Sequence, residues 1–132
     1  MTNVVTMGPH RIWFDEGTNI LHLEINWDFS IEDSKEYGRI SKRMLMGFNG
    51  RRIQMIDLTN AKAMDRVARG QLKDFSVSYG EDPELTAIIC PNPVVRMFAK
   101  IIMRSSRTRS NFFKNEEEAM AWINSTLVSE GS

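Results

Sequence analysis

The sequence predicts a single α/β domain, a mostly parallel five-stranded sheet covered by four helices, in the order β-β-α-β-α-β-α-β-α. Strand-like and helix-like segments alternate along most of the chain, which favours right-handed crossovers and parallel strands. Two strand-like segments are apolar on both faces, as expected for strands covered on each side. A chain of 132 residues is long enough for one core, so we expect residues 1–132 to form one domain.

The chain is expected to open with an antiparallel β-hairpin. Residues 10–15 and 19–26 alternate apolar and polar positions and are separated by the turn residues 16–18. Residues 1–8 and 129–132 are expected to be loose ends, so the ordered core should extend from about residue 10 to about residue 128.

The middle of the chain predicts two helices with a buried strand between them. A helix is expected over residues 31–48, because Ser30 and Asp33 resemble a capping box and apolar residues then recur at helical spacing. The apolar run over residues 53–58 predicts a buried strand. A second helix is predicted from an apolar stripe made up of Met64, Val67, Ala68, Leu72, Phe75 and Tyr79.

The second half repeats this pattern. Residues 85–90 predict another short buried strand, and an Asn-Pro pair then begins a helix that should extend over residues 93–105. Residues 110–113 fit a last strand. Asn115 and Glu118 form a capping pattern for a final helix.

Composition excludes several classes of protein. The chain has 17 basic and 17 acidic residues, so it has no overall electrostatic attraction to nucleic acid, and we expect no nucleic-acid partner. Cys90 is the only cysteine and cannot form an internal disulfide. The first residues lack the pattern of a secretory signal, and no apolar run approaches the roughly 20 residues needed to cross a bilayer. We therefore expect a cytoplasmic protein.

The segment that follows the strand at residues 53–58 is the first candidate for a functional site. Ligands and partners usually dock where the carboxyl end of a strand meets a helix start, which directs attention to Asp57, Thr59, Asn60 and Asp65. The alternative is purely structural. The first three residues would form an Asx-type turn, and Asp65 would cap the next helix.

The element order and the segment DLTNAKAMD (residues 57–65) resemble the SpoIIAA-like (STAS) domains, over roughly residues 10–128. In the anti-sigma-factor antagonists of that family, the corresponding segment reads approximately DLS, a spacer and MDSSG, and a kinase phosphorylates a serine. Here Arg66 and the next two residues stand where the serines and glycine would be. The closing FFKNEEEAMAWI looks like an uncharacterised bacterial branch. The resemblance implies a regulatory protein-interaction module that lacks the phosphorylatable serine.

A basic stripe on the helix at residues 93–105 is the second candidate site. Arg96, Lys100 and Arg104 recur at every fourth position, and apolar residues occupy the rest of the helix. Residues 91–114 contain six basic residues and no acidic one, which leaves a net charge of minus six on the remainder of this neutral chain. The apolar arc of about 240° is wider than the ~100° stripe that one core-facing side requires.

Three interpretations of this helix remain open. Its apolar residues are buried on most sides and the basic stripe is solvated. Alternatively, Met97 and Met103 are apolar contacts for another subunit or partner, whose acidic residues pair with the stripe. In the third interpretation, the helix attaches to an anionic lipid surface.

Catalytic chemistry has little support in the sequence. His10 and His22 are the only histidines, which makes a zinc site improbable, and we expect no cofactor, no metal and no catalytic residue. Cys90 precedes a predicted helix start, where the helix dipole and Arg96 would lower its pKa. The interpretation that the residue type favours is a buried strand-end position, since a free cysteine usually packs as a small hydrophobic side chain.

The function that these observations predict is a non-enzymatic, cytoplasmic interaction or regulatory module. It is expected to bind a protein partner or itself, as a homo-oligomer and most simply a dimer, through apolar surface that includes the helix at residues 93–105. The second hypothesis is a carrier of a small hydrophobic ligand or lipid, because SpoIIAA-like domains resemble lipid-binding relatives. The third is a thiol enzyme acting through Cys90.

Overall fold

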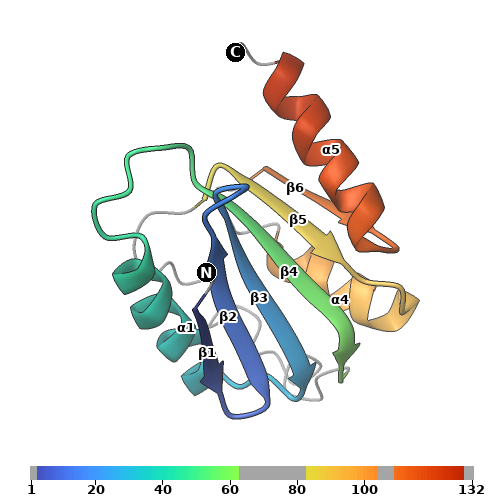
Figure 1. Ribbon diagram of the computed structural model, residues 1–132. Helices are drawn as coiled ribbons and strands as arrows, with labels where there is room; N and C mark the ends of the chain where they lie inside the picture. The colour runs from blue at the N-terminus through green and yellow to red at the C-terminus, as the bar shows by residue number, and fades with distance from the viewer. Residues whose placement is uncertain (1–2, 63–82, 104–108, 130–132) are drawn as a thin grey trace.

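Six strands lie in one mixed sheet in the order of the chain, β1-β2-β3-β4-β5-β6 (Figure 1). The computed structural model describes residues 3–62, 83–103 and 109–129. The strands are β1 (Val4–Met7), β2 (His10–Asp15), β3 (Ile20–Trp27), β4 (Ile53–Ala61), β5 (Leu85–Ile89) and β6 (Arg109–Phe113). The described helices are α1 (Ile31–Met44), α4 (Pro93–Met103) and α5 (Glu116–Ser129).

The predicted α/β fold is confirmed, with one strand more than expected. Residues 4–7, predicted as part of a loose end, form the edge strand β1 and pair antiparallel with β2. Gly8, with a positive φ of 57°, and Pro9 lie between the two strands. Met7 is buried in the core. The β-branched side chains of Val4, Val5 and Thr6 favour a strand, and pairing with β2 and burial of Met7 order the segment.

The remaining elements follow the predicted order. The hairpin of β2 and β3 is antiparallel, and β3, β4, β5 and β6 pair in parallel. The helix predicted over residues 31–48 ends at Met44, and the helix predicted around residues 64–79 lies outside the described residues.

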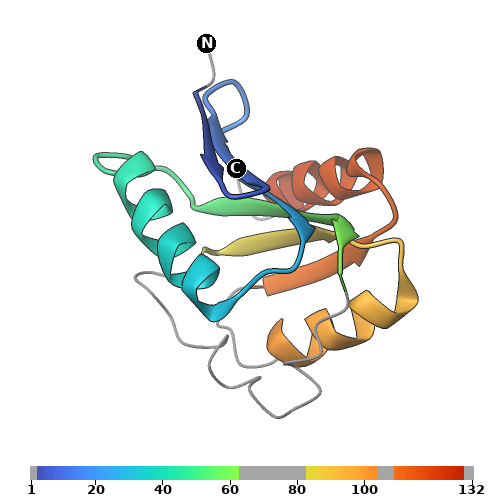
Figure 2. The same ribbon diagram turned by 90° about the horizontal axis from the view of Figure 1, so that it is seen from below.

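Helices cover both faces of the sheet (Figure 2). On one side, which we call the α1 face, α1 and α4 pack against a cluster that includes Ile12, Leu23 and Ile88. On the opposite side, the α5 face, Ala119 and Ile123 of α5 pack mainly over β5 and β6. The hairpin of β1 and β2 curls toward the side on which α5 lies.

The start of α1 is fixed by the capping box that the sequence predicts. The Ser30 hydroxyl accepts a hydrogen bond from the Asp33 N–H at 3.0 Å, and the Asp33 carboxylate accepts one from the Ser30 N–H at 2.9 Å. Further along α1, the Tyr37 hydroxyl donates to the Gln54 side-chain oxygen on β4. Burial raises the pKa of Tyr37, so the hydroxyl keeps its proton and remains a donor.

Candidate functional site

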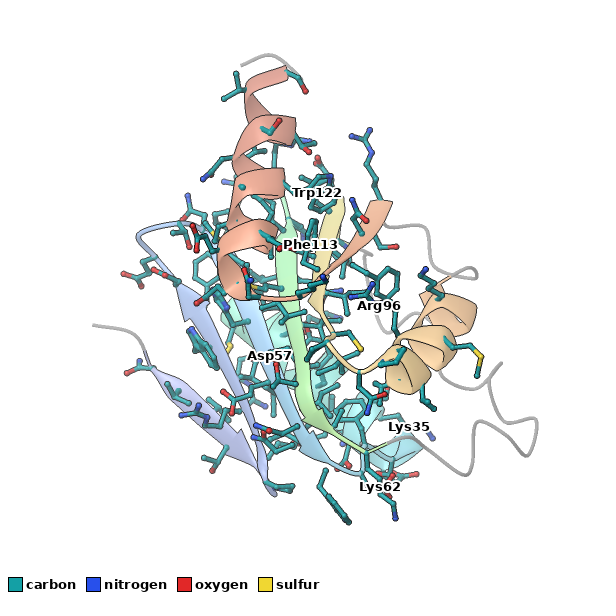
Figure 3. The ribbon with its side chains drawn as sticks, turned by 90° about the vertical axis from the view of Figure 1, so that its right-hand side faces the viewer. Lys35, Asp57, Lys62, Arg96, Phe113 and Trp122 are labelled. Atoms are coloured by element: carbon teal, nitrogen blue, oxygen red, sulfur yellow. The ribbon has the colours of Figure 1, made fainter. Side chains whose placement is uncertain are left out.

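The carboxyl ends of the parallel strands lie at one edge of the sheet, and we call this edge the carboxyl edge. It is formed by the ends of β3, β4, β5 and β6. Figure 3 shows Lys62 at the end of β4, and Arg96 reaching from α4 toward the sheet. The two sites predicted from the sequence thus belong to neighbouring parts of one edge.

β4 continues three residues beyond the predicted strand end, through Thr59 and Asn60 to Ala61, and also includes Asp57. Glu24 of β3 faces Asp57, whereas Asn26 faces Asn60, so three steps along β4 correspond to two along β3. This mismatch is a β-bulge, a feature that often lies next to functional sites.

The Asp57 side chain stabilises this bulge. Its Oδ1 accepts hydrogen bonds from the Thr59 N–H at 2.9 Å and from the Thr59 hydroxyl at 2.6 Å. This is the Asx-type bonding that the structural interpretation predicted, but it occurs inside a strand and not in a turn. Thr59 remains exposed beside it.

Asn26 connects three strands at the same edge. Its backbone N–H donates to His10 Nδ1 at 3.0 Å. Its side-chain amide donates to the carbonyl oxygen of Pro9 at 2.9 Å and to the Glu24 carboxylate at 3.0 Å. The Asn60 side-chain amide in turn donates to Asn26 Oδ1 at 3.3 Å. The ends of β3 and β4 are therefore tied to the start of β2.

Glu24 and Asp57 are register neighbours on the α5 face. Burial alone would raise the pKa of Glu24. Hydrogen bonds from Arg11 and Asn26, together with the Arg11 charge, outweigh burial, and the pKa of Glu24 lies below its ordinary value. Glu24 therefore stays ionised and paired, and Asp57 is bound by Thr59, so this pair of carboxylates is not arranged as a general acid and base.

Trp27 is the most unusual residue of the carboxyl edge. It ends β3 with a positive φ of 73°, which is rare for a residue with a side chain, and 64% of it is exposed. Lys62, the residue that follows β4, contacts it. The Lys62 N–H donates to the Trp27 carbonyl oxygen at 3.0 Å, and Lys62 Nζ lies 5.1 Å from the centre of the indole ring, a cation–π contact.

The predicted basic stripe is not uniformly solvated. Arg96 turns toward the sheet and donates from Nε and Nη2 to the carbonyl oxygen of Cys90, at 3.2 and 2.8 Å. Lys100 Nζ lies 5.7 Å from the centre of the Phe112 ring on β6. Met97 is 53% exposed, and Val94 of the same helix is half exposed. Arg96 thus has a structural role, while the neighbouring apolar side chains face solvent.

Cys90 does not have the environment expected of a reactive thiol. The residue is fully buried, and burial raises the pKa of its thiol in spite of the opposing charge of Arg96 and the contact with the Asn92 backbone. The interpretation of Cys90 as a buried strand-end residue is therefore confirmed, and the alternative of a lowered pKa is wrong. Among the described residues, no group of three or more histidine, cysteine or acidic side chains is placed to hold a metal ion.

Several predicted site residues lie outside the described part of the chain. These are Asp65, Arg66 and Arg104, together with the side chain of Met103. Conversely, the sequence prediction missed Asn26 and Trp27. The signal that could have found them is the sequence Asn-Trp-Asp between a strand and a helix cap. The tryptophan there has polar neighbours and fits no apolar repeat, so nothing in the pattern places it in the core.

The chain was compared with protein families, with curated proteins and with solved structures. A family model described as a domain of unknown function, DUF7793, matches residues 12–127. No curated protein matches the chain. Among solved structures, an uncharacterised protein of the DUF3478 family from Shewanella loihica PV-4, with a SpoIIAA-like fold, superposes with a TM-score of 0.55. The two proteins are 16% identical over 92% of this chain and 91% of the other. The predicted SpoIIAA-like fold is thereby confirmed.

Within the described residues, no helix is both long and apolar enough to span a membrane.

Proposed function

This chain belongs to the DUF7793 family of domains of unknown function, and on that premise we propose that it is a protein-recognition module that binds its partner through the carboxyl edge of the sheet. The module acts by binding and not by catalysis. Its contact surface comprises Trp27, Thr59, Asn60 and Lys62, at the ends of β3 and β4.

The observation that carries this proposal is the exposed indole of Trp27 in a left-handed backbone conformation. Such a conformation costs on the order of 1–3 kcal/mol and persists only where the surroundings impose it, often at recognition sites. Tryptophan is also the side chain that most often dominates a protein interface. Lys62 Nζ lies over the ring, and any ordering of the indole by this contact before binding reduces the entropy lost on binding.

The neighbouring polar groups support the same surface. Thr59 and Asn60 are exposed beside Trp27 and present hydroxyl and amide groups, while their bonds to Asp57 and Asn26 hold them in place. An apolar centre with polar groups around it is the usual arrangement of a protein interface.

A photo-reactive aromatic amino acid in place of Trp27 tests this proposal directly. After irradiation in cells, we expect a specific protein adduct at position 27. An adduct of twice the mass of the chain would identify the partner as a second copy. The matched control is position 46, since Met46 is 79% exposed beyond the opposite end of α1. Equal adducts at both positions, or none at position 27, would contradict the proposal.

The alternative of a lipid-binding protein has one supporting observation, the exposed Val94 and Met97 beside Lys100. Arg96 is engaged with the Cys90 carbonyl and is less available to an anionic headgroup. Vesicles of anionic phospholipid provide the discriminating measurement. Binding that survives replacement of Trp27 and is lost on replacement of Met97 would favour the lipid function over protein recognition.

A further inference from the structure

His10 is the one buried side-chain polar group in the described part of the chain whose nitrogen, Nε2, lacks a hydrogen-bond partner. The residue is fully buried at the start of β2. A buried polar atom without a partner destabilises the folded state, and its position therefore needs an explanation.

The hydrogen bond to the other ring nitrogen fixes where the proton lies. His10 Nδ1 accepts from the Asn26 N–H, so it carries no proton in this state. The single ring proton therefore lies on Nε2. Nε2 is 3.5 Å from Asp33 Oδ2, which already accepts the capping hydrogen bond from Ser30. This separation is too long for a good hydrogen bond.

His10 thereby contacts both sides of the segment that carries Trp27. Asn26 precedes Trp27 and is bound to the ring nitrogen, while the Phe29 ring meets the imidazole edge-on, with ring centres 5.1 Å apart. Asp33 lies just beyond, in the first turn of α1. The imidazole therefore contacts Asn26 and Phe29, on either side of Trp27, and we call residues 26–30 the Trp27 segment.

We propose that His10 is a pH-sensitive clamp that holds the Trp27 segment when neutral and releases it when protonated. A second proton must go to Nδ1, where it would meet the Asn26 N–H, donor against donor, so this hydrogen bond breaks. The imidazolium is then drawn to the carboxylate of Asp33. The Asn26 N–H then loses its acceptor, and the segment becomes more mobile at its N-terminal end.

The charged groups around the ring come from two elements. Asp33 faces it from α1, with Oδ2 3.5 Å from Nε2. On β3, Glu24 binds the Asn26 side chain but is paired with Arg11, so its charge is largely compensated. Phe29 and Pro9 are uncharged. Asp33 is therefore the group that sets how readily the clamp opens.

The test is a nuclear magnetic resonance titration of the free protein from about pH 8 to about pH 5, the range in which histidines ordinarily titrate. At the basic end, we expect the His10 ring to carry its proton on Nε2 alone. As the pH falls, the Asn26 amide and the Trp27 indole should shift with the same midpoint as the His10 ring. Exchange of the Asn26 amide, corrected for its intrinsic rate, should accelerate about tenfold.

Two variants make the test specific. Asp33→Asn keeps an acceptor for the Ser30 N–H but removes the charge, so the transition should move to lower pH. His22→Gln is the matched control, because His22 is the other histidine and stacks on Trp13, away from this segment, and its transition at Asn26 should be unchanged. A proton on Nδ1 at the basic end, no shift of Asn26, or an unchanged midpoint in Asp33→Asn would overturn the clamp.

This inference rests on the proposed function only where it links Trp27 to a partner. The titration needs no partner, so the two claims can fail separately. A partner that binds without Trp27 would refute the recognition surface and leave the clamp intact, whereas a titration without effect on Asn26 would refute the clamp alone.

Discussion

At the scale of single residues, the carboxyl edge combines one exposed anchor with several side chains that only hold the scaffold. Trp27 faces solvent, whereas the Arg96 guanidinium donates two hydrogen bonds to the carbonyl oxygen of Cys90, just after β5. Both are large side chains near the same edge, and exposure and hydrogen bonding separate their roles. Charge alone would have assigned Arg96 to binding and would have overlooked Trp27.

Arg96→Lys should lower the free energy of unfolding by about 1–3 kcal/mol, because an ammonium group cannot reproduce the forked pair of hydrogen bonds to the Cys90 carbonyl. Urea denaturation measures this change. Lys100→Ala is the matched control. It removes a charge from the same helix, and among the described residues the Lys100 ammonium contacts only the Phe112 ring. Equal effects of the two substitutions would show that the fork contributes nothing specific.

His22 predicts a loss of stability in acid. Burial lowers the pKa of His22, against the opposing carboxylates of Glu116 and Asp15. The folded state therefore disfavours the proton. Its stabilising contribution is fully present above the ordinary pKa of about 6.5 and is lost as the pH falls through the lower, folded-state value. We expect His22→Gln to lose less unfolding free energy than the wild type between about pH 7.5 and about pH 5. A parallel loss in both proteins would show that His22 is not responsible.

At the scale of elements, local chemistry explains where the helices begin and how the sheet edges differ. The capping box starts α1. On the edge strand β6, the Asn111 side chain accepts from the Phe112 N–H at 2.8 Å, which satisfies a backbone group that an edge would otherwise leave open. The opposite edge, β1, is instead kept short, at four residues.

Ser30→Ala should cost about 1 kcal/mol of unfolding free energy, since it removes the acceptor for the Asp33 N–H at the start of α1. Ser34→Ala, one turn further on, serves as the comparison and should be neutral or slightly stabilising, because alanine is the better helix former. Chemical denaturation of both variants gives the answer. A loss at Ser34 as large as that at Ser30 would indicate a general effect of removing hydroxyl groups from this helix.

Periodicity and capping patterns predicted most of these elements, because they depend on residues close together in sequence. Strands β2 to β6 and the start of α1 follow from such local signals. The centre of the candidate site does not. Asn26 is hydrogen-bonded to His10, 16 positions away in sequence, and to Asn60, 34 positions away. The local sequence pattern indicates neither contact. The prediction found Asp57, Thr59 and Asn60 from their place after a buried strand, but the residues that join them come from another part of the chain.

At the scale of the whole molecule, the two faces of the sheet are covered differently. Two described helices pack on the α1 face, while α5 lies mainly over β5 and β6 and leaves the α5 face of β1 and β2 to its own side chains. There, Trp13 stacks on His22 with ring centres 4.9 Å apart.

The central claim is that Trp27 anchors a protein partner. Once a partner has been isolated by cross-linking, its affinity for the wild type, Trp27→Ala and Met46→Ala should be measured by calorimetric titration. We expect Trp27→Ala to weaken binding about tenfold or more, and Met46→Ala to leave it unchanged. Equal affinities of the wild type and Trp27→Ala would contradict the account.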